Sequence, residues 1–249
     1  MGMVTDAQNR SGTRSMSKNQ PRQPKTLWAR GGKRALDLVS AVLLLAVFSP
    51  ILLVSGLLIK ITSRGPVFFI QERAGKDGTI FRLVKFRTMR GSRRPDPKEL
   101  VPLEHPDITR VGRVLRRLKI DELPQLRNVL RGEMSLVGPR PTLPDQVAAY
   151  DGFRRQRLRM RPGVTGLAQV YSSASAPWDE RILYDIAYVR SCSARLDVAI
   201  LLRTLLVTVV GEARTTRPFA TTRFTKLIDL SEPGVPVALV SRQGSVMME

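Results

Sequence analysis

The longest uncharged stretch of this chain limits the structures that it can adopt more than any other feature. From Leu38 to Ile59 the sequence reads LVSAVLLLAVFSPILLVSGLLI, without a charged side chain. A straight helix of that length would measure ~33 Å, close to the ~30 Å hydrocarbon core of a bilayer. The stretch begins too far from the N-terminus, and is too long, to be the apolar part of a signal peptide. We therefore expect a membrane segment.

A Ser49-Pro50 pair lies at the centre of this stretch. Proline removes one internal helix hydrogen bond and crowds the preceding turn, so it bends or breaks a helix. If the helix breaks there, Leu36–Phe48 and Ile51–Ile61 are each only ~16–20 Å long, too short to cross a bilayer. The Ser49 hydroxyl can donate to a carbonyl one turn earlier and so repair part of the broken ladder.

Basic residues flank the membrane segment on both sides. They are Lys25, Arg30, Lys33 and Arg34 before it, and Lys60 and Arg64 after it. A transmembrane span favours one positively charged flank, whereas a re-entrant hairpin places both flanks at the same membrane face. The residues alone leave both topologies open, a kinked span and a hairpin.

The chain is strongly basic, with 41 Lys and Arg residues against 21 Asp and Glu and a formal net charge of +20. Because 43% of its residues are hydrophobic, it can still build a folded core. The charge points to nucleic acid, an anionic membrane surface or a phosphorylated substrate as partner. A single cysteine, Cys192, and a single histidine, His105, exclude a disulfide framework, a Cys-rich zinc site and a histidine-based triad.

Composition divides the chain into a disordered basic arm (1–30), the membrane segment (31–63), a compact body (64–211) and a variable, weakly ordered tail (212–249). Hydrophobic patterning in the body predicts strands at 67–70 and 80–86 and helices at 121–130 and 145–159. A loop is expected at 92–107, which is rich in Pro and charge. Residues 197–210 are apolar but contain Arg203, so we expect an interfacial or buried helix there.

Two adjacent carboxylates, Asp121 and Glu122, stand where a helix is expected to begin, just after several basic residues. A helix N-terminus stabilises anions, so Asp121 should stay ionised and a phosphate could bind nearby. An ionised Asp beside phosphate-binding arginines is a candidate nucleophile, and a neighbouring Glu can help to hold Mg²⁺. The simpler interpretation is that Asp121 caps the helix and Glu122 favours its first turn.

Three other groups of basic residues give weaker signals. Gly138-Pro139-Arg140-Pro141 presents one guanidinium from a rigid turn, which suits a phosphate or carboxylate partner. Arg161-Pro162-Gly163-Val164-Thr165-Gly166 repeats that arrangement. Lys85, Arg87 and Arg90 alternate along an expected strand and its exit, where a solvated face is the default interpretation.

Taken together and in order, these motifs resemble those of the bacterial sugar transferase family, in its short, monotopic polyprenyl-phosphate phosphoglycosyl transferase form. The resemblance runs from about residue 31 to residue 210 and preserves the order and spacing of the motifs. Those motifs are Lys33-Arg34-x-x-Asp37, Ser49-Pro50, Gly65-Pro66-Val67-Phe68-Phe69, Gln71-Glu72-Arg73-x-Gly75, Lys85-Phe86-Arg87-Thr88-Met89, Asp121-Glu122-Leu123-Pro124-Gln125-Leu126, the run from Asn128 to Pro141, Arg161 to Gly166, and Tyr184-Asp185-x-x-Tyr188-Val189.

The resemblance implies an α+β protein on the bacterial inner membrane. A re-entrant helix-break-helix hairpin, broken at Ser49-Pro50, would precede a compact, mainly helical catalytic domain that faces the cytoplasm. That domain would contain a small β element and interfacial amphipathic helices. The implied reaction transfers a sugar-1-phosphate from a UDP-sugar to polyprenyl (undecaprenyl) phosphate and releases UMP. It would be the first membrane step of polysaccharide or glycoconjugate synthesis.

The resemblance also implies roles for individual residues. Asp121 would attack the diphosphate and form a covalent aspartyl-phosphosugar intermediate, with Glu122 assisting and Mg²⁺ held by both carboxylates. Arg116, five residues before Asp121, would bind the polyprenyl phosphate, and the Pro139-Arg140-Pro141 corner would lie near the uridine. Anionic lipids of the inner leaflet are expected partners and nucleic acid is not; the oligomeric state, including a homo-oligomer, stays open.

Two alternatives come from other classes of protein. A membrane-tethered nucleic-acid-binding protein would explain the charge but not the Asp121-Glu122 pair, and only 6% of the residues are aromatic. A non-catalytic membrane scaffold of the same fold would have no use for an intact carboxylate pair. UMP release from a UDP-sugar separates the enzyme from both.

Overall fold

The computed structural model of the chain describes residues 28–90, 101, 103–173, 176–211, 216–229 and 231–236. The expected basic arm lies outside these ranges up to residue 27. The same holds for residues 91–100 and 102 of the expected loop and for residues 237–249 of the expected tail.

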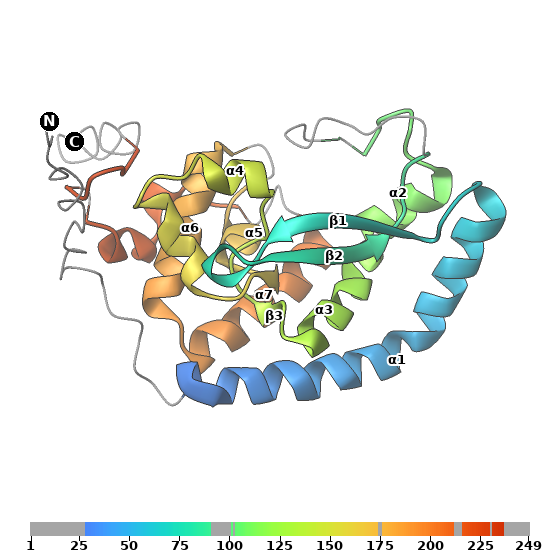
Figure 1. Ribbon diagram of the computed structural model, residues 1–249, viewed down its shortest axis with the longest axis horizontal. Helices are drawn as coiled ribbons and strands as arrows, with labels where there is room; N and C mark the ends of the chain where they lie inside the picture. Colours follow the sequence, from blue (N-terminus) through green and yellow to red (C-terminus); the bar gives the residue numbers. More distant parts are fainter. Residues whose placement is uncertain are drawn as a thin grey trace, which may run out of the picture.

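The apolar stretch forms one helix, α1, from Lys33 to Thr62, which follows a short π-helical turn at Trp28–Gly32. In the described part of the chain it is the one helix long and apolar enough, by length and composition, to cross a membrane. Figure 1 shows α1 running along one edge of the molecule and then bending, so that its second half leaves the line of the first. The expected break at Ser49-Pro50 is therefore corrected to a bend, because the helix continues through Pro50.

The helix continues past Pro50 because a side chain replaces the missing backbone donor. Pro50 has no N–H to offer the carbonyl of Ala46, four residues earlier. The Ser49 hydroxyl donates to that carbonyl instead, at 2.8 Å. The predicted back-bond from Ser49 is thus confirmed, and the acceptor that Pro50 orphans is satisfied within the same turn.

A β-hairpin follows α1. Strand β1 (Phe68–Ala74) pairs antiparallel with β2 (Ile80–Phe86), and Phe68 lies opposite Phe86. Both predicted strands are confirmed, although β1 begins one residue later and runs further than expected. A second small sheet pairs β3 (Ser135–Val137) with β4 (Gly163–Thr165) in parallel. Together with the helices, these two sheets make the protein mainly helical and α+β, as expected.

Six further helices complete the body. They are α2 (Arg110–Arg117), α3 (Leu126–Arg131), α4 (Pro144–Ala148), α5 (Leu167–Tyr171), α6 (Trp178–Ser191) and α7 (Ala194–Val210). The single basic helix expected at 145–159 is wrong: α4 ends at Ala148, and a separate 3₁₀ helix spans Arg154–Arg159. The Asp151 carboxylate accepts a hydrogen bond from the Arg154 N–H at 2.7 Å, which starts a new turn.

Helix α6 forms the centre of the core, and part of the expected tail packs against it. Tyr184 of α6 meets the Phe219 ring edge-on, with the ring centroids 4.8 Å apart, and Phe224 at 6.5 Å. The Tyr184 hydroxyl also donates to the Arg217 carbonyl at 2.6 Å. The described tail residues therefore contribute to the core, contrary to the expected weak order, because their aromatic rings cover apolar surface on α6.

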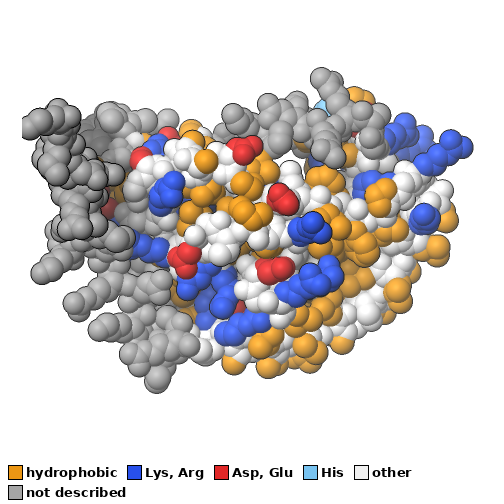
Figure 2. All heavy atoms as spheres, viewed as in Figure 1, with side chains coloured by type: hydrophobic (Ala, Val, Ile, Leu, Met, Phe, Trp, Pro, Cys, Tyr) orange, Lys and Arg blue, Asp and Glu red, His pale blue; other side chains and the backbone are white. Residues whose placement is uncertain are grey.

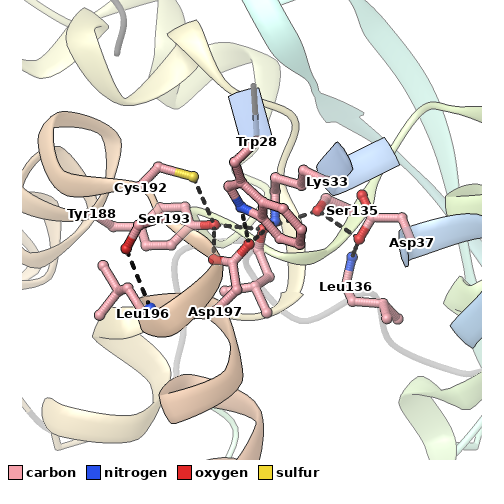
Figure 3. Close-up of polar contacts among 11 residues, drawn as sticks. Trp28, Lys33, Asp37, Ser135, Leu136, Tyr188, Cys192, Ser193, Leu196 and Asp197 are labelled. Atoms are coloured by element: carbon pink, nitrogen blue, oxygen red, sulfur yellow. Dashed lines mark hydrogen bonds and ion pairs between the residues drawn. The ribbon is translucent and has the colours of Figure 1, made fainter. Parts of the chain in front are cut away.

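Charged residues in the first turns of α1 attach it to the body (Figure 3). Lys33 forms an ion pair with Asp197 of α7 at 2.8 Å. Asp37, which is buried, accepts a hydrogen bond from the backbone N–H of Leu136 in β3 at 2.9 Å. Arg34 donates to two carbonyls at the end of α3. The start of α1 thus contacts α3, β3 and α7 at once.

The other end of α1 is tied to the same body. Ser63, which ends the helix, and Arg64 both offer carbonyls to the Arg87 guanidinium, at 2.9 and 2.8 Å. Ile59 packs in a small apolar cluster with Phe86 of β2. The default interpretation of Arg87 as part of a solvated face is wrong, because its side chain is buried against the end of α1.

Apolar side chains of α1 and α7 remain on the surface. Figure 2 shows hydrophobic side chains gathered along the edge that α1 forms, with Lys and Arg side chains beside them. Helix α7 exposes Val198, Leu202, Leu205 and Val209 at helical spacing, while it buries Ile200 in the core. Two helices with exposed apolar faces and basic neighbours indicate association with a membrane.

Candidate active site

The carboxylate pair lies on a 3₁₀ helix, Ile120–Gln125, which leads directly into α3. This corrects the single helix expected at 121–130: the segment tightens before Leu126, and Pro124 has no N–H for a regular α-helical ladder. Lys119 precedes the 3₁₀ helix with φ at 57°, so the chain turns sharply there. The N-cap position belongs to Lys119, and Asp121 therefore does not cap this helix.

Asp121 is buried, with 7% of its surface exposed. Burial raises its pKa to about 6, and the neighbouring Glu122 charge adds to that shift. Lys85 and Arg116 act in the opposite direction and favour the carboxylate. Asp121 is thus mostly ionised at neutral pH, as predicted, but close enough to its pKa to titrate under mildly acidic conditions.

Glu122 is held in the opposite state. Its Oε1 accepts a hydrogen bond from Arg140 Nη2 at 3.0 Å, which also makes an ion pair. Burial alone would raise the pKa of Glu122, but Arg140 and Lys85 outweigh it and lower the pKa below its ordinary value. Two adjacent carboxylates therefore carry different proton affinities, an arrangement that separates their chemical roles.

A pocket opens beside Glu122. Its lining comprises Arg73, Leu83, Lys85, Glu122, Gln125, Arg140, Pro141 and Gly163. Arg73 and Lys85 are the residues that sequence reasoning missed here. Lys85 is not on a solvated face: Lys85 and Leu83 share one face of β2, and both line the pocket. The signal was present in the strand pattern, because Phe81 and Leu83 on that face are apolar and buried.

Arg73 carries a charge that the protein neutralises poorly. Burial, together with repulsion from Arg140, lowers its pKa to about 10. Its Nη2 donates to Gln71 at 2.6 Å and its Nη1 to the Pro141 carbonyl at 3.3 Å, while its buried Nε has no hydrogen-bond partner. A guanidinium with neutral partners in a pocket that also holds Lys85 and Arg140 suits an anionic ligand.

Arg116 lies on the other side of the carboxylate pair. Its Nε donates to Thr88 Oγ1 at 2.8 Å, which fixes the guanidinium beside the end of β2. Burial lowers the pKa of Arg116, and the charges of Asp121 and Glu122 partly restore it. The structure thus brings Arg116, Asp121, Glu122 and Arg140 together, whereas the predicted helix-break residues Ser49 and Pro50 belong to α1.

The Pro139-Arg140-Pro141 corner separates two hollows. Pro141 lines the pocket beside Glu122, and Pro139 lines a second, mostly apolar hollow together with Ala74, Leu158 and Met160. Buried Arg157 supports the corner: its Nη2 donates to the Arg140 carbonyl at 2.9 Å and pairs with Asp185 of α6.

Glycine is required where this corner meets β4. The Gly138 N–H donates to the Thr165 carbonyl at 2.9 Å, and Gly163 N–H donates to the Pro139 carbonyl at 2.9 Å. A Cβ on Gly163 would lie 2.1 Å from the Gly138 nitrogen, which leaves no room for any side chain. This close backbone approach holds Arg140 against Glu122.

The carboxylate pair fits a magnesium ion that a phosphorylated substrate would help to hold. The described residues contain no group of three or more His, Cys, Asp or Glu side chains that could bind a metal by themselves. Mg²⁺ is commonly bound by one or two carboxylates plus substrate phosphates and water. None of the described residues donates a hydrogen bond to the Asp121 carboxylate, so its oxygens are available for such a role.

Comparison with known proteins defines the family. The family model described as bacterial sugar transferase matches residues 28–211. Its match includes α1, both small sheets and the 3₁₀ helix that carries Asp121 and Glu122. The chain belongs to the bacterial sugar transferase family.

Several relatives carry names that state a reaction. A UDP-glucose:undecaprenyl-phosphate glucose-1-phosphate transferase of Caulobacter vibrioides is 44% identical over 187 residues, covering 70% of this chain and 68% of the relative. A UDP-N-acetylgalactosamine-undecaprenyl-phosphate N-acetylgalactosaminephosphotransferase of Aeromonas hydrophila is 40% identical over 185 residues, covering 72% of this chain and 44% of the relative. An uncharacterized sugar transferase of Bacillus subtilis, EpsL, is 40% identical over 200 residues, which are 80% of this chain and 98% of EpsL. The chain thus spans less than half of the Aeromonas relative and nearly all of EpsL.

Proposed function

We propose that this chain is a phosphoglycosyl transferase that moves a sugar-1-phosphate from a UDP-sugar to undecaprenyl phosphate and releases UMP. The observation that carries the proposal is the Asp121–Glu122 pair, set between Arg116 on one side and a pocket with three further basic side chains on the other. Relatives with this type of transfer in their names support it. The product would enter the synthesis of an exopolysaccharide or a related glycoconjugate.

Asp121 is the proposed nucleophile. Its carboxylate oxygen attacks the phosphorus that carries the sugar, the bond from that phosphorus to the UMP oxygen breaks, and UMP leaves. An aspartyl-phosphosugar intermediate remains on the enzyme. A carboxylate with a raised pKa is more basic and so a better nucleophile than an ordinary one, yet it is still ionised at neutral pH.

The second step regenerates Asp121. An oxygen of undecaprenyl phosphate attacks the same phosphorus, and the bond to the Asp121 carboxylate breaks. Arg116 lies on the side of the pair away from Arg140 and is the proposed holder of this acceptor phosphate. Arg73, Lys85 and Arg140 would hold the donor diphosphate, because phosphoryl transfer depends mainly on positioning and charge neutralisation.

Asp121 and Glu122 would also hold Mg²⁺, which when bound neutralises charge on the phosphate oxygens. The apolar hollow beside Pro139 is the proposed place of the uridine, one corner away from the diphosphate. Arg140, which belongs to both hollows, would contact the donor between its two ends.

The membrane topology follows from the two attachments of α1. Lys33 at its start and Ser63 at its end both bind one folded body, so a full span would require that body on both sides of the membrane at once. We therefore propose that α1 enters and leaves the same leaflet of the bacterial inner membrane with the body on the cytoplasmic face, where nucleotide sugars are available. The exposed apolar stripe of α7 and the basic surface would contact the anionic lipids of that leaflet.

The test is UMP release by the full chain in detergent or nanodiscs, with Mg²⁺, undecaprenyl phosphate and a panel of UDP-sugars. We expect release with at least one sugar, and none with Asp121→Asn. Asp145→Asn, at an exposed aspartate on α4, is the matched control and should retain activity. Silence from a well-folded wild type across the panel would favour a scaffold, and a salt-sensitive shift in DNA mobility would favour a nucleic-acid-binding protein.

A further inference from the structure

Gln125 has a side chain whose surroundings do not explain it. The residue is 4% exposed, yet among the residues that the structure describes none forms a hydrogen bond with its carboxamide. A buried amide without a partner is costly, so most such groups are paired with protein or with water. Gln125 also lines the pocket beside Glu122, and the pocket is therefore where its partner should be sought.

The local helix geometry aims Gln125 at the same space as Glu122. In a 3₁₀ helix there are three residues per turn, so side chains three apart lie one above the other. Glu122 and Gln125 are three apart in the 3₁₀ helix Ile120–Gln125, and both line the pocket. Asp121, one position earlier, belongs to a different face of that helix.

The chemistry of the pocket divides the tasks among its side chains. Arg73, Lys85 and Arg140 supply positive charge, which suits phosphate oxygens. Gln125 is neutral and offers both a donor and an acceptor, the combination that matches a hydroxyl group. Leu83 and Gly163 add no polar side chain. The one uncharged polar side chain on this wall would therefore contact an uncharged polar part of the ligand.

We propose that Gln125 recognises the sugar of the nucleotide sugar, through hydrogen bonds from its carboxamide to a sugar hydroxyl or acetamido group. This inference rests on the proposed function, which brings the sugar-bearing phosphorus to Asp121 and leaves the uridine beyond Arg140. The sugar is then the neutral part of the donor nearest to the 3₁₀ helix. Gln125 is a specificity-determining residue in this arrangement, because sugars differ in the hydroxyl or amide that they present to it.

The experiment compares binding of a UDP-sugar with binding of UMP. Full-length wild type and Gln125→Met, which keeps the size and removes the hydrogen-bonding groups, are titrated in nanodiscs with UDP-glucose, UDP-galactose and their N-acetylated counterparts. For the preferred sugar we expect Kd to rise about tenfold, the effect of losing a hydrogen bond, with the Kd of UMP unchanged. The preference among the four sugars should also narrow.

Two further variants keep the result interpretable. Gln125→Asn retains the amide but withdraws it by one methylene, and should weaken the same sugar in the same direction if the Met variant folds poorly. Gln156→Met removes another buried glutamine, whose amide is bonded to Arg190 at 2.8 Å, and should lower the melting temperature without changing either Kd.

Specific outcomes overturn the proposal. A Kd for the UDP-sugar within twofold of wild type in both Gln125 variants would refute it. An equal loss of UMP affinity would refute it as well, by placing Gln125 at the nucleotide. A wild type that binds UDP-sugar but releases no UMP would refute the transfer reaction and leave the binding comparison valid. A wild type that binds neither ligand would overturn both.

Discussion

The ion pair between Lys33 and Asp197 gives the sharpest prediction for stability. Lys33→Met removes the positive partner and keeps most of the apolar stem. The Lys33 side chain is 12% exposed and that of Asp197 is 1% exposed, so the substitution leaves an almost fully buried carboxylate without its cation. Removing one partner of a buried pair costs ~3–5 kcal/mol.

The contacts that remain place the cost at the lower end of that range. The Tyr188 hydroxyl and the Trp28 Nε1 still donate to Asp197, at 2.6 and 3.1 Å, as Figure 3 shows. We therefore expect a loss of ~3 kcal/mol, which for a protein of this size lowers the melting temperature by ~6–12 °C. Asp197→Asn should cost less, ~1–2 kcal/mol, because the partly exposed Lys33 ammonium can reach water.

The assay is thermal unfolding of the full chain in one detergent, followed by circular dichroism. The double variant should be no less stable than Asp197→Asn plus the loss of apolar contacts, so the two single effects should not add. Lys76→Met is the matched control, because Lys76 pairs with Asp77 at 4.0 Å on the surface and should change the unfolding free energy by less than ~0.5 kcal/mol. A loss below ~1 kcal/mol for Lys33→Met, or strict additivity in the double variant, would refute the reasoning.

Three other predictions concern activity and the membrane segment. Because the carboxylate form of Asp121 attacks and burial raises its pKa to about 6, kcat/KM for UMP release should fall about tenfold per pH unit below pH 6, and a flat profile from pH 5 to 8 would contradict this. Chelation of Mg²⁺ with EDTA should abolish UMP release and leave the circular dichroism spectrum unchanged, and Mg²⁺ should restore the activity; activity that persists in EDTA would remove the metal from the site. Ser49→Ala should lower stability in nanodiscs by ~1 kcal/mol, because it leaves the Ala46 carbonyl unpaired in lipid, whereas Ser40→Ala tests a serine outside that bond.

The features that the sequence predicted well are local ones. The strands at 68–74 and 80–86 and the bond from Ser49 to Ala46 depend on residues close in the chain, so spacing and residue type were sufficient. The carboxylate pair was also found from its own sequence, since adjacent Asp121 and Glu122 followed by Pro124 are an unusual start to a helix.

The features that the sequence did not predict depend on what lies across the fold. Alternation along β2 indicates that Lys85 and Arg87 occupy opposite faces, but it cannot say that the 3₁₀ helix covers one face and the end of α1 the other. Arg73 was missed for the same reason, because its neighbours Arg140 and Glu122 come from distant segments. The tail beyond residue 211 looked polar, and only the position of Tyr184 shows what Phe219 covers.

The local repair at Pro50 bears on the order in which this protein is made. Helix α1 leaves the ribosome early, whereas its ion-pair partner Asp197 follows on the order of ten seconds later at common rates of synthesis. During that interval the helix meets lipid without the body that will eventually attach to both of its ends. A serine beside the proline satisfies the orphaned carbonyl with an atom made in the same instant. The bent helix can therefore settle in the membrane first and serve as the platform on which the remaining chain folds.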